Sequence, residues 1–287
     1  MTFRTRFAPS PTGPLHLGHA YSAILAHDMA RACHGDFILR IEDIDQSRAR
    51  PEWEAQIYDD LKWLGLGWDA DIRRQSDELE SYEAALEQLW GKGILYGCSC
   101  NRKDIQAAMS APQEGVEQPI GPDGIIYPRT CSVKPQPNER PRTMALRLNM
   151  DSVVIPANNQ FSFEETGAGP NRETGFICFD GEYARSGLGD IVVARRDMGT
   201  SYHLSVVLDD AAQDITHVVR GQDLFDATRI HVVLQHFLDL PTPTYHHHQL
   251  IRDAEGKRLA KRDDARAIRL FRDEGASPDD IRRMVGL

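Results

Sequence analysis

The sequence predicts an α/β protein built on a Rossmann-like parallel sheet. Strands and helices alternate from the start, with strands over Thr2–Phe7 and Asp36–Asp43 and helices over His16–Arg31 and Glu52–Leu64. Apolar residues recur every three to four positions in the helical stretches, and β-favouring residues fill the strands. This alternation favours parallel strands joined by right-handed crossovers. A chain of 287 residues can also bury a sizeable core.

The rest of the chain extends this pattern. We expect a helix over Ser81–Trp90, another over Phe225–Leu238 and a last one that begins at Ser277 and Pro278, a cap followed by a first-turn proline. Strands are expected over Met144–Leu148, Ser152–Ile155, Asn159–Phe163, Asp190–Arg196, Tyr202–Asp210, Ile215–Asp223 and Tyr245–Ile251.

Composition narrows the function classes. The formal net charge of −10 argues mildly against a nucleic-acid binder, but residues 252–272 hold eight basic and four acidic side chains, a local net charge of +4. A polyanion would meet that segment. No apolar run reaches the length of a membrane span and no signal peptide is evident, so we expect a cytoplasmic protein without a membrane partner. Five widely spaced cysteines argue against a disulfide framework.

One stretch, Arg6–His19, organises the chain. It joins the first strand to the first helix through a Pro- and Gly-rich turn, a layout in which the helix N-terminus receives an anion, usually phosphate. His16 and His19 are three residues apart, so both can donate to phosphate oxygens from one side of the first turn. Gly18 keeps side chains away from a closely approaching ligand. The glycine spacing matches neither a Walker loop nor a dinucleotide fingerprint.

His16-Leu17-Gly18-His19 resembles the HIGH signature of class I aminoacyl-tRNA synthetases, and the preceding Arg6–Gly13 resembles their glutamyl branch. Gly256–Arg262 resembles the KMSKS signature of the same class, with arginine for the first lysine and alanine for the serine. The resemblance implies catalytic roles for His16, His19 and Lys261, and ATP with Mg²⁺ bound by these residues together with Gly18 and Arg258.

The resemblance also implies a glutamate site. Its residues would be Arg6, Ala8, Ser10, Glu42, Tyr202 and Arg220. The residue types suit the substrate, because two arginines can bind two carboxylates and Glu42 can take the ammonium. Glu42 lies at the end of an expected strand and Arg220 just after an apolar stretch, and ligands meet a parallel sheet at the strands' carboxyl ends.

Cys98, Cys100 and Cys131 suggest a structural metal, most plausibly zinc. No histidine lies between residues 98 and 131 and tyrosine is an unusual zinc ligand, so chemistry alone leaves a metal and three buried thiols equally open. The pattern resembles the zinc-binding insertion of glutamyl-Q tRNA(Asp) synthetases, which implies Tyr127 as fourth ligand. The segment 101–126 looks longer than in that family. His246–His248 is not expected to bind metal, because alternate residues of a strand face opposite ways.

The resemblance sets the expected domains. Residues 1–95 and 186–252 would form the two halves of the catalytic domain, 96–185 an inserted zinc-binding, acceptor-type subdomain, and 253–287 the KMSKS-like loop with a short helical end. Only 25 residues follow Arg262, so we expect no anticodon-binding domain. Such short glutamyl enzymes activate glutamate with ATP and attach it to queuosine in the anticodon loop of tRNA(Asp). A monomer is expected.

Three alternatives stay open. The first is a glutamyl enzyme that charges tRNA 3′ ends with help from another chain. The second is glutaminyl specificity, disfavoured because an amide does not require a second arginine. The third is a non-catalytic paralogue that binds RNA or metal, against which the intact histidines and Lys261 weigh.

Overall fold

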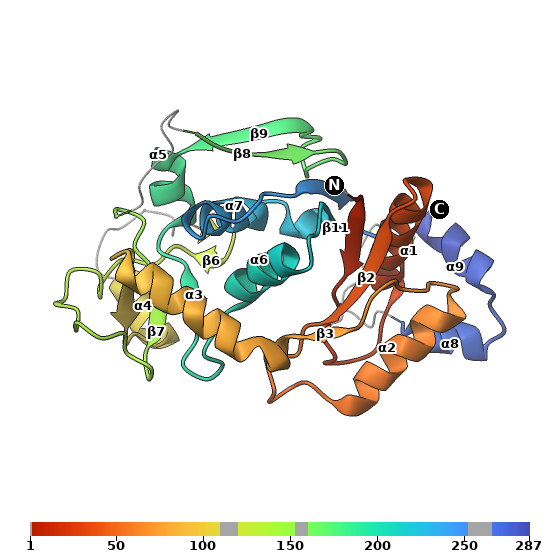
Figure 1. Cartoon of the computed structure of the whole chain (residues 1–287), viewed down its shortest axis with the longest axis horizontal. Coiled ribbons are helices and arrows are strands. Elements are labelled where there is room, and N and C mark those ends of the chain that lie inside the picture. Colours follow the sequence, from red (N-terminus) through yellow and green to blue (C-terminus); the bar gives the residue numbers. More distant parts are fainter. Residues whose placement is uncertain (1, 110–119, 153–159, 252–265) are drawn as a thin grey trace.

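The computed structural model describes residues 2–109, 120–152, 160–251 and 266–287. Two groups of mainly parallel strands lie side by side (Figure 1). One group of parallel strands is β1 (Arg4–Phe7), β2 (Asp36–Ile41) and β3 (Arg73–Arg74). The other is β11 (His217–Gly221), β12 (Thr244–His248) and β8 (Gln160–Glu165), with β9 (Gly175–Asp180) antiparallel at its edge. The groups adjoin where the Thr216 N–H donates to the Arg4 carbonyl at 3.0 Å.

Helices flank these strands and divide the core in two. Around α1 (Leu17–Ala32) and α2 (Pro51–Trp63), apolar side chains of β1 and β2 form one buried cluster. The other surrounds α3 (Leu79–Gly91), α6 (Tyr202–Ala212) and α7 (Ala227–Phe237). At the C-terminal end, α8 (Ile268–Asp273) and α9 (Pro278–Val285) lie beside α1 and α2 (Figure 1). The α/β fold with a parallel sheet is thus confirmed.

A second, antiparallel sheet lies at the opposite end of the molecule (Figure 1). It consists of β4 (Leu95–Cys98), β7 (Ala145–Leu148) and β10 (Val192–Ala194), with α4 (Arg102–Met109) and the hairpin of β5 (Ile120–Gly121) and β6 (Gly124–Ile125) nearby. Strand pairing crosses the expected segment boundaries, because β8 pairs with β12 whereas β10 pairs with β7. The division into domains itself stays a prediction.

One predicted strand is wrong. Tyr202–Asp210 belongs to α6, which begins after Ser201, whose Oγ accepts the Leu204 N–H at 3.3 Å. An apolar run of this length in a buried segment does not distinguish strand from helix by periodicity, and the serine cap decides for helix. The short helices α4 and α8 and the edge strand β9 were not expected. Most of Ser152–Ile155 lies outside the described residues.

None of the helices in the described ranges is long and apolar enough to cross a membrane.

Candidate active site

The N-terminus of α1 is built from the two histidines of the Arg6–His19 stretch. His16 is the N-cap, and its Nδ1 accepts the Gly18 N–H at 3.1 Å. His19 Nδ1 accepts the His16 N–H at 3.2 Å, and the rings stack with centroids 3.8 Å apart. A neutral imidazole that accepts at Nδ1 carries its proton on Nε2. Both rings therefore present Nε2–H donors at a helix N-terminus, where anions bind well.

Gly18 has a packing reason to lack a side chain. A Cβ there would lie 3.1 Å from His16 Cε1 and 3.2 Å from its Nδ1. That is tighter than usual van der Waals contact, so a larger residue would displace the His16 ring. Gly18 therefore leaves room for the His16 ring that caps α1.

The segment after the KMSKS-like loop contacts this motif directly. Ala267 forms an antiparallel bridge with His16, and the Ile268 N–H donates to the Leu15 carbonyl at 2.9 Å. On the loop's other side, Ile251 packs against the apolar cluster that includes α1. Arg258 and Lys261 themselves lie outside the described residues.

Arg6 is buried against a carboxylate that sequence reasoning missed. Its Nε donates to Asp210 Oδ1 at 3.0 Å and its Nη2 to Oδ2 at 3.4 Å. Asp210 also accepts from Arg40 Nη1 at 2.8 Å. Burial alone would raise the pKa of Asp210, but the two guanidinium groups hold it below its ordinary value. Arg6 is therefore already neutralised by one carboxylate, which the sequence did not reveal.

Glu42 lies in the same charged group. Its Oε1 lies 3.4 Å from Arg40 Nη2, and its backbone N–H donates to the Pro9 carbonyl at 3.0 Å. The second contact holds the end of β2 against the loop that carries Ala8, half-buried, and Ser10, exposed. Burial raises the pKa of Glu42, and its arginine neighbours only partly oppose this.

Arg220, at the end of β11, has a different environment from Arg6. Its Nε donates to His247 Nε2 at 3.1 Å, its Nη1 to His231 Nδ1 at 3.2 Å, and its Nη2 to Thr228 Oγ1 at 2.7 Å and the Leu224 carbonyl at 3.3 Å. All four acceptors are uncharged. Among the described residues no carboxylate forms an ion pair with this guanidinium, which is only 5% exposed.

Tyr202 lies within electrostatic reach of both Arg6 and Arg220. Burial raises the pKa of its phenol, and Arg220, Glu42, Arg6 and Asp210 all act electrostatically on it. Its ring lies 5.7 Å from that of His231. The structure therefore brings four of the expected glutamate residues (Arg6, Glu42, Tyr202 and Arg220) into one electrostatic neighbourhood.

Several residues of this neighbourhood were not foreseen, and all make long-range contacts. Asp209 accepts from Tyr82 OH, Gln75 Nε2 and Arg73 Nε at 2.8–3.0 Å and anchors α6. The three consecutive histidines diverge as expected: His246 contacts Thr166, His247 contacts Arg220, and His248 contacts Ser22.

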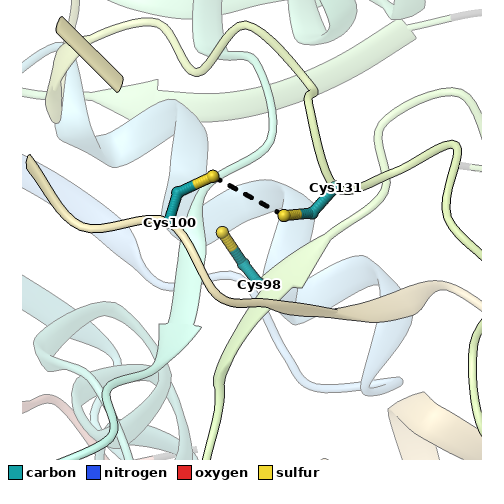
Figure 2. A group of neighbouring side chains, drawn as sticks. All are labelled: Cys98, Cys100 and Cys131. Carbon is teal, nitrogen blue, oxygen red and sulfur yellow. Dashed lines mark hydrogen bonds between the residues drawn. The ribbon is translucent and has the colours of Figure 1, made fainter. Parts of the chain in front are cut away.

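The cysteines converge. The Sγ atoms of Cys98, Cys100 and Cys131 lie within 4.8 Å of one another and point inward (Figure 2). Tyr127 OH lies 3.4 Å from Cys98 Sγ and 3.3 Å from Cys100 Sγ. A tetrahedral zinc ion about 2.3 Å from each sulfur would space two sulfurs about 3.8 Å apart. Cys100 and Cys131 are 3.6 Å apart, so the donor set fits a metal of this kind.

Comparisons with known proteins agree on one family. Residues 2–148 and 173–287 match the family described as tRNA synthetases class I (E and Q), catalytic domain. The chain is 61% identical over 285 residues to a glutamyl-Q tRNA(Asp) synthetase of Rhodobacter capsulatus, covering 99% of both, and 38% identical to that of Symbiobacterium thermophilum, covering 96% of this chain and 83% of the relative. A glutamate tRNA ligase of Elizabethkingia meningosepticum, solved with its amino acid, superposes with a TM-score of 0.78 at 25% identity. The chain covers 61% of that protein.

Proposed function

The chain belongs to the class I tRNA synthetases of the E and Q type, and we propose that it activates L-glutamate with ATP and transfers the glutamyl group to queuosine in the anticodon loop of tRNA(Asp). The relative with 61% identity over 99% of both chains is named a glutamyl-Q tRNA(Asp) synthetase. The enzyme is a ligase of this family.

The observation that carries the substrate assignment is the environment of Arg220. A buried guanidinium with only uncharged acceptors keeps its charge for a ligand, and a bound carboxylate would supply the missing negative charge. Arg220 therefore binds the glutamate side-chain carboxylate. Glu42, which like Arg220 acts electrostatically on Tyr202, takes the ammonium. Arg6 already donates to Asp210 through two nitrogens, so it cannot offer the same N–H groups to the substrate; its contribution is mainly positive electrostatic potential.

Adenylate formation brings the α-carboxylate to the α-phosphate, so catalysis consists mainly of positioning and charge neutralisation. His16 and His19 donate to the phosphates from the α1 N-terminus. Lys261 supplies the cation, and the packing of its flanking residues Ile251 and Ala267 around α1 and His16 supports this. Gly18 and Arg258 complete the ATP site, and Ala8 and Ser10 contact the glutamate. Mg²⁺, bound with ATP, supplies the remaining positive charge.

Zinc fits the cysteine cluster and would be structural. Cys98, Cys100, Cys131 and Tyr127 would hold it as four ligands, which is typical of a closed site. Burial and the hydrogen bonds with the cysteines raise the pKa of the Tyr127 phenol, so a metal at this site would have to supply the positive charge that favours its deprotonated oxygen; the Arg147 guanidinium lies 3.8 Å over the ring. The partner is the tRNA(Asp) anticodon stem–loop, and the enzyme acts as a monomer.

The acceptor is tested with isolated anticodon stem–loops. A queuosine-bearing stem–loop of tRNA(Asp) has no acceptor 3′ end, so labelled glutamate can enter it only at the anticodon loop. We expect labelling of this fragment and none of a matched fragment with guanosine in place of queuosine. Labelling of whole tRNA(Glu) but of neither fragment would instead identify a 3′-end charging enzyme, the activity named for the Elizabethkingia relative.

A further inference from the structure

We propose that Glu165, His247 and His231 are positioning residues that hold Arg220 through two histidine relays and so reserve its charge for the substrate carboxylate. This inference rests on the proposed glutamate site. It concerns how the protein satisfies the hydrogen bonds of a buried arginine without neutralising it.

The first relay runs from Arg220 to Glu165. An arginine in a protein only donates, so His247 Nε2, 3.1 Å from Arg220 Nε, must accept. The imidazole proton then sits on Nδ1, which lies 2.5 Å from Glu165 Oε2. Burial lowers the pKa of His247 to about 4, so the ring is neutral at pH 7. One tautomer alone satisfies both neighbours.

Glu165 is fixed in this role by further bonds. Its Oε1 accepts the backbone N–H groups of His247 at 2.9 Å and Gly167 at 2.8 Å, and both relay side chains are fully buried. Only glycine fits at position 167 so close to the backbone of β12, because a Cβ there would lie 2.3 Å from the His247 carbonyl oxygen. A carboxylate that only accepts matches these three donors. A carboxamide would place an N–H against one of them.

The second relay runs from Arg220 through His231 and His203 to Asp123. His231 Nδ1 accepts from Arg220 Nη1, so its Nε2–H donates to His203 Nδ1 at 3.1 Å. His203 then carries its proton on Nε2, 3.5 Å from Asp123 Oδ1 in the β5–β6 hairpin. Burial and the Arg220 charge keep the pKa of His231 well below its ordinary value. This relay ends on a half-exposed carboxylate, so its far end tolerates change better than Glu165 does.

The consequence is electrostatic. Each carboxylate is separated from Arg220 by at least one neutral imidazole, so the guanidinium is oriented but not paired. A substrate carboxylate then makes the first direct ion pair with it. Glutamine, with a neutral amide, does not compensate the buried charge, and discrimination between the two amino acids follows.

The test uses glutamate-dependent ATP–pyrophosphate exchange by the full chain. Glu165→Gln should raise the KM for glutamate at least tenfold, leave the KM for ATP unchanged and reduce the preference for glutamate over glutamine. His246→Gln, on the same strand but turned to Thr166, is the matched control and should behave as wild type. Asp123→Asn should change the glutamate KM by less than Glu165→Gln. Unchanged glutamate KM in folded Glu165→Gln would overturn the proposal.

A second pair of variants separates positioning from folding. Asparagine places an acceptor near the position of His231 Nδ1, and leucine has the same shape without one. His231→Asn should keep most of the glutamate affinity, and His231→Leu should lose it at least tenfold, with similar thermal stability. Equal kinetics for the two would overturn the role of His231, even if Glu165→Gln fails to fold.

A third readout needs no activity. In wild-type protein labelled with ¹⁵N-histidine, His247 should carry its proton on Nδ1 and His231 on Nε2, with signals assigned through His247→Gln and His231→Asn. The opposite tautomers would overturn the relays. If the wild type shows the expected tautomers but no glutamate-dependent exchange, the relays stand as structure, while the proposed function and the positioning role that rests on it both fail.

Discussion

Arg6 Nε lies 3.0 Å from Asp210 Oδ1, and the two side chains are 204 residues apart in the sequence. Both are buried, and Asp210 also accepts from Arg40. The pair joins β1 to α6 within the proposed glutamate site. Its energetic importance comes less from the attraction itself than from what breaking it would leave: a buried Arg6 guanidinium without its carboxylate, and a buried Arg40 that keeps only Glu42 and Asp209.

Asp210→Asn should therefore lower the free energy of unfolding by about 3–5 kcal/mol, measured by urea denaturation at pH 7. The folded pKa of Asp210 is depressed, so its stabilisation is complete above the unfolded value of about 3.9 and is lost as pH falls from there through the folded pKa. In Asp210→Asn, the part of the acid-induced loss of stability that comes from Asp210 should be absent. Asp214→Asn, which removes an exposed partner of Arg4, is the control and should change little. Wild-type stability in Asp210→Asn would refute this.

The Arg6–Asp210 pair shows which parts of the site can be predicted from the sequence and which cannot. The α1 motif is local: the His16–His19 spacing defines a helix start and its donors, and the structure forms it so. Asp210 contacts Arg6, and Glu165 contacts His247, only through the tertiary fold, and no spacing rule links residues 204 or 82 positions apart. The missed helix α6 differs, because its apolar run fits a strand or a helix but Ser201 just before it is a local N-cap signal for a helix.

The family resemblance reached further than the patterns did. It nominated Arg6, Glu42, Tyr202 and Arg220, which four separate elements bring together. It could not say that Arg6 is paired and Arg220 is not. That difference depends on which side chains α6, α7 and β12 place nearby, and it is the basis for the proposed role of Arg220.

His16 has a capping role and a proposed catalytic one, and one substitution separates them. His16→Asn keeps an N-cap acceptor for the Gly18 N–H but has no Nε2–H donor. We expect an unfolding temperature close to wild type and a kcat for pyrophosphate exchange about 10²- to 10³-fold lower. His16→Ala should also lose about 1 kcal/mol of stability. Full activity in His16→Asn would mean that His16 acts only as the N-cap of α1.

Glu42 should make glutamate binding depend on pH. Its folded pKa is raised by burial, and the substrate ammonium binds only the carboxylate form. The KM for glutamate should therefore fall as pH rises from the acid side through this raised pKa. Glu42→Gln should raise the KM about tenfold or more and abolish the dependence, whereas the exposed Glu52→Gln should retain it. A pH-independent wild-type KM would contradict the assignment.

The cysteine cluster should hold one zinc ion per chain, measured by elemental analysis of purified protein. Chelation should lower the unfolding temperature, because a closed zinc site stabilises the fold. Tyr127→Phe keeps the ring beneath Arg147 but removes the oxygen, and should bind zinc more weakly. Cys178→Ala, an exposed cysteine on β9, is the control. Metal-free protein that a chelator does not destabilise would mean three ordinary buried thiols.

In the proposed glutamate site, the unpaired, buried Arg220 gives this synthetase its preference for glutamate. The most direct measurement is kcat/KM for ATP–pyrophosphate exchange with glutamate and with glutamine, for wild type and Arg220→Ala. Wild type should strongly prefer glutamate, and Arg220→Ala should lose about 3–5 kcal/mol of transition-state binding for glutamate with little change for glutamine. Normal glutamate activation by Arg220→Ala, or a wild type indifferent to glutamate, would contradict the account.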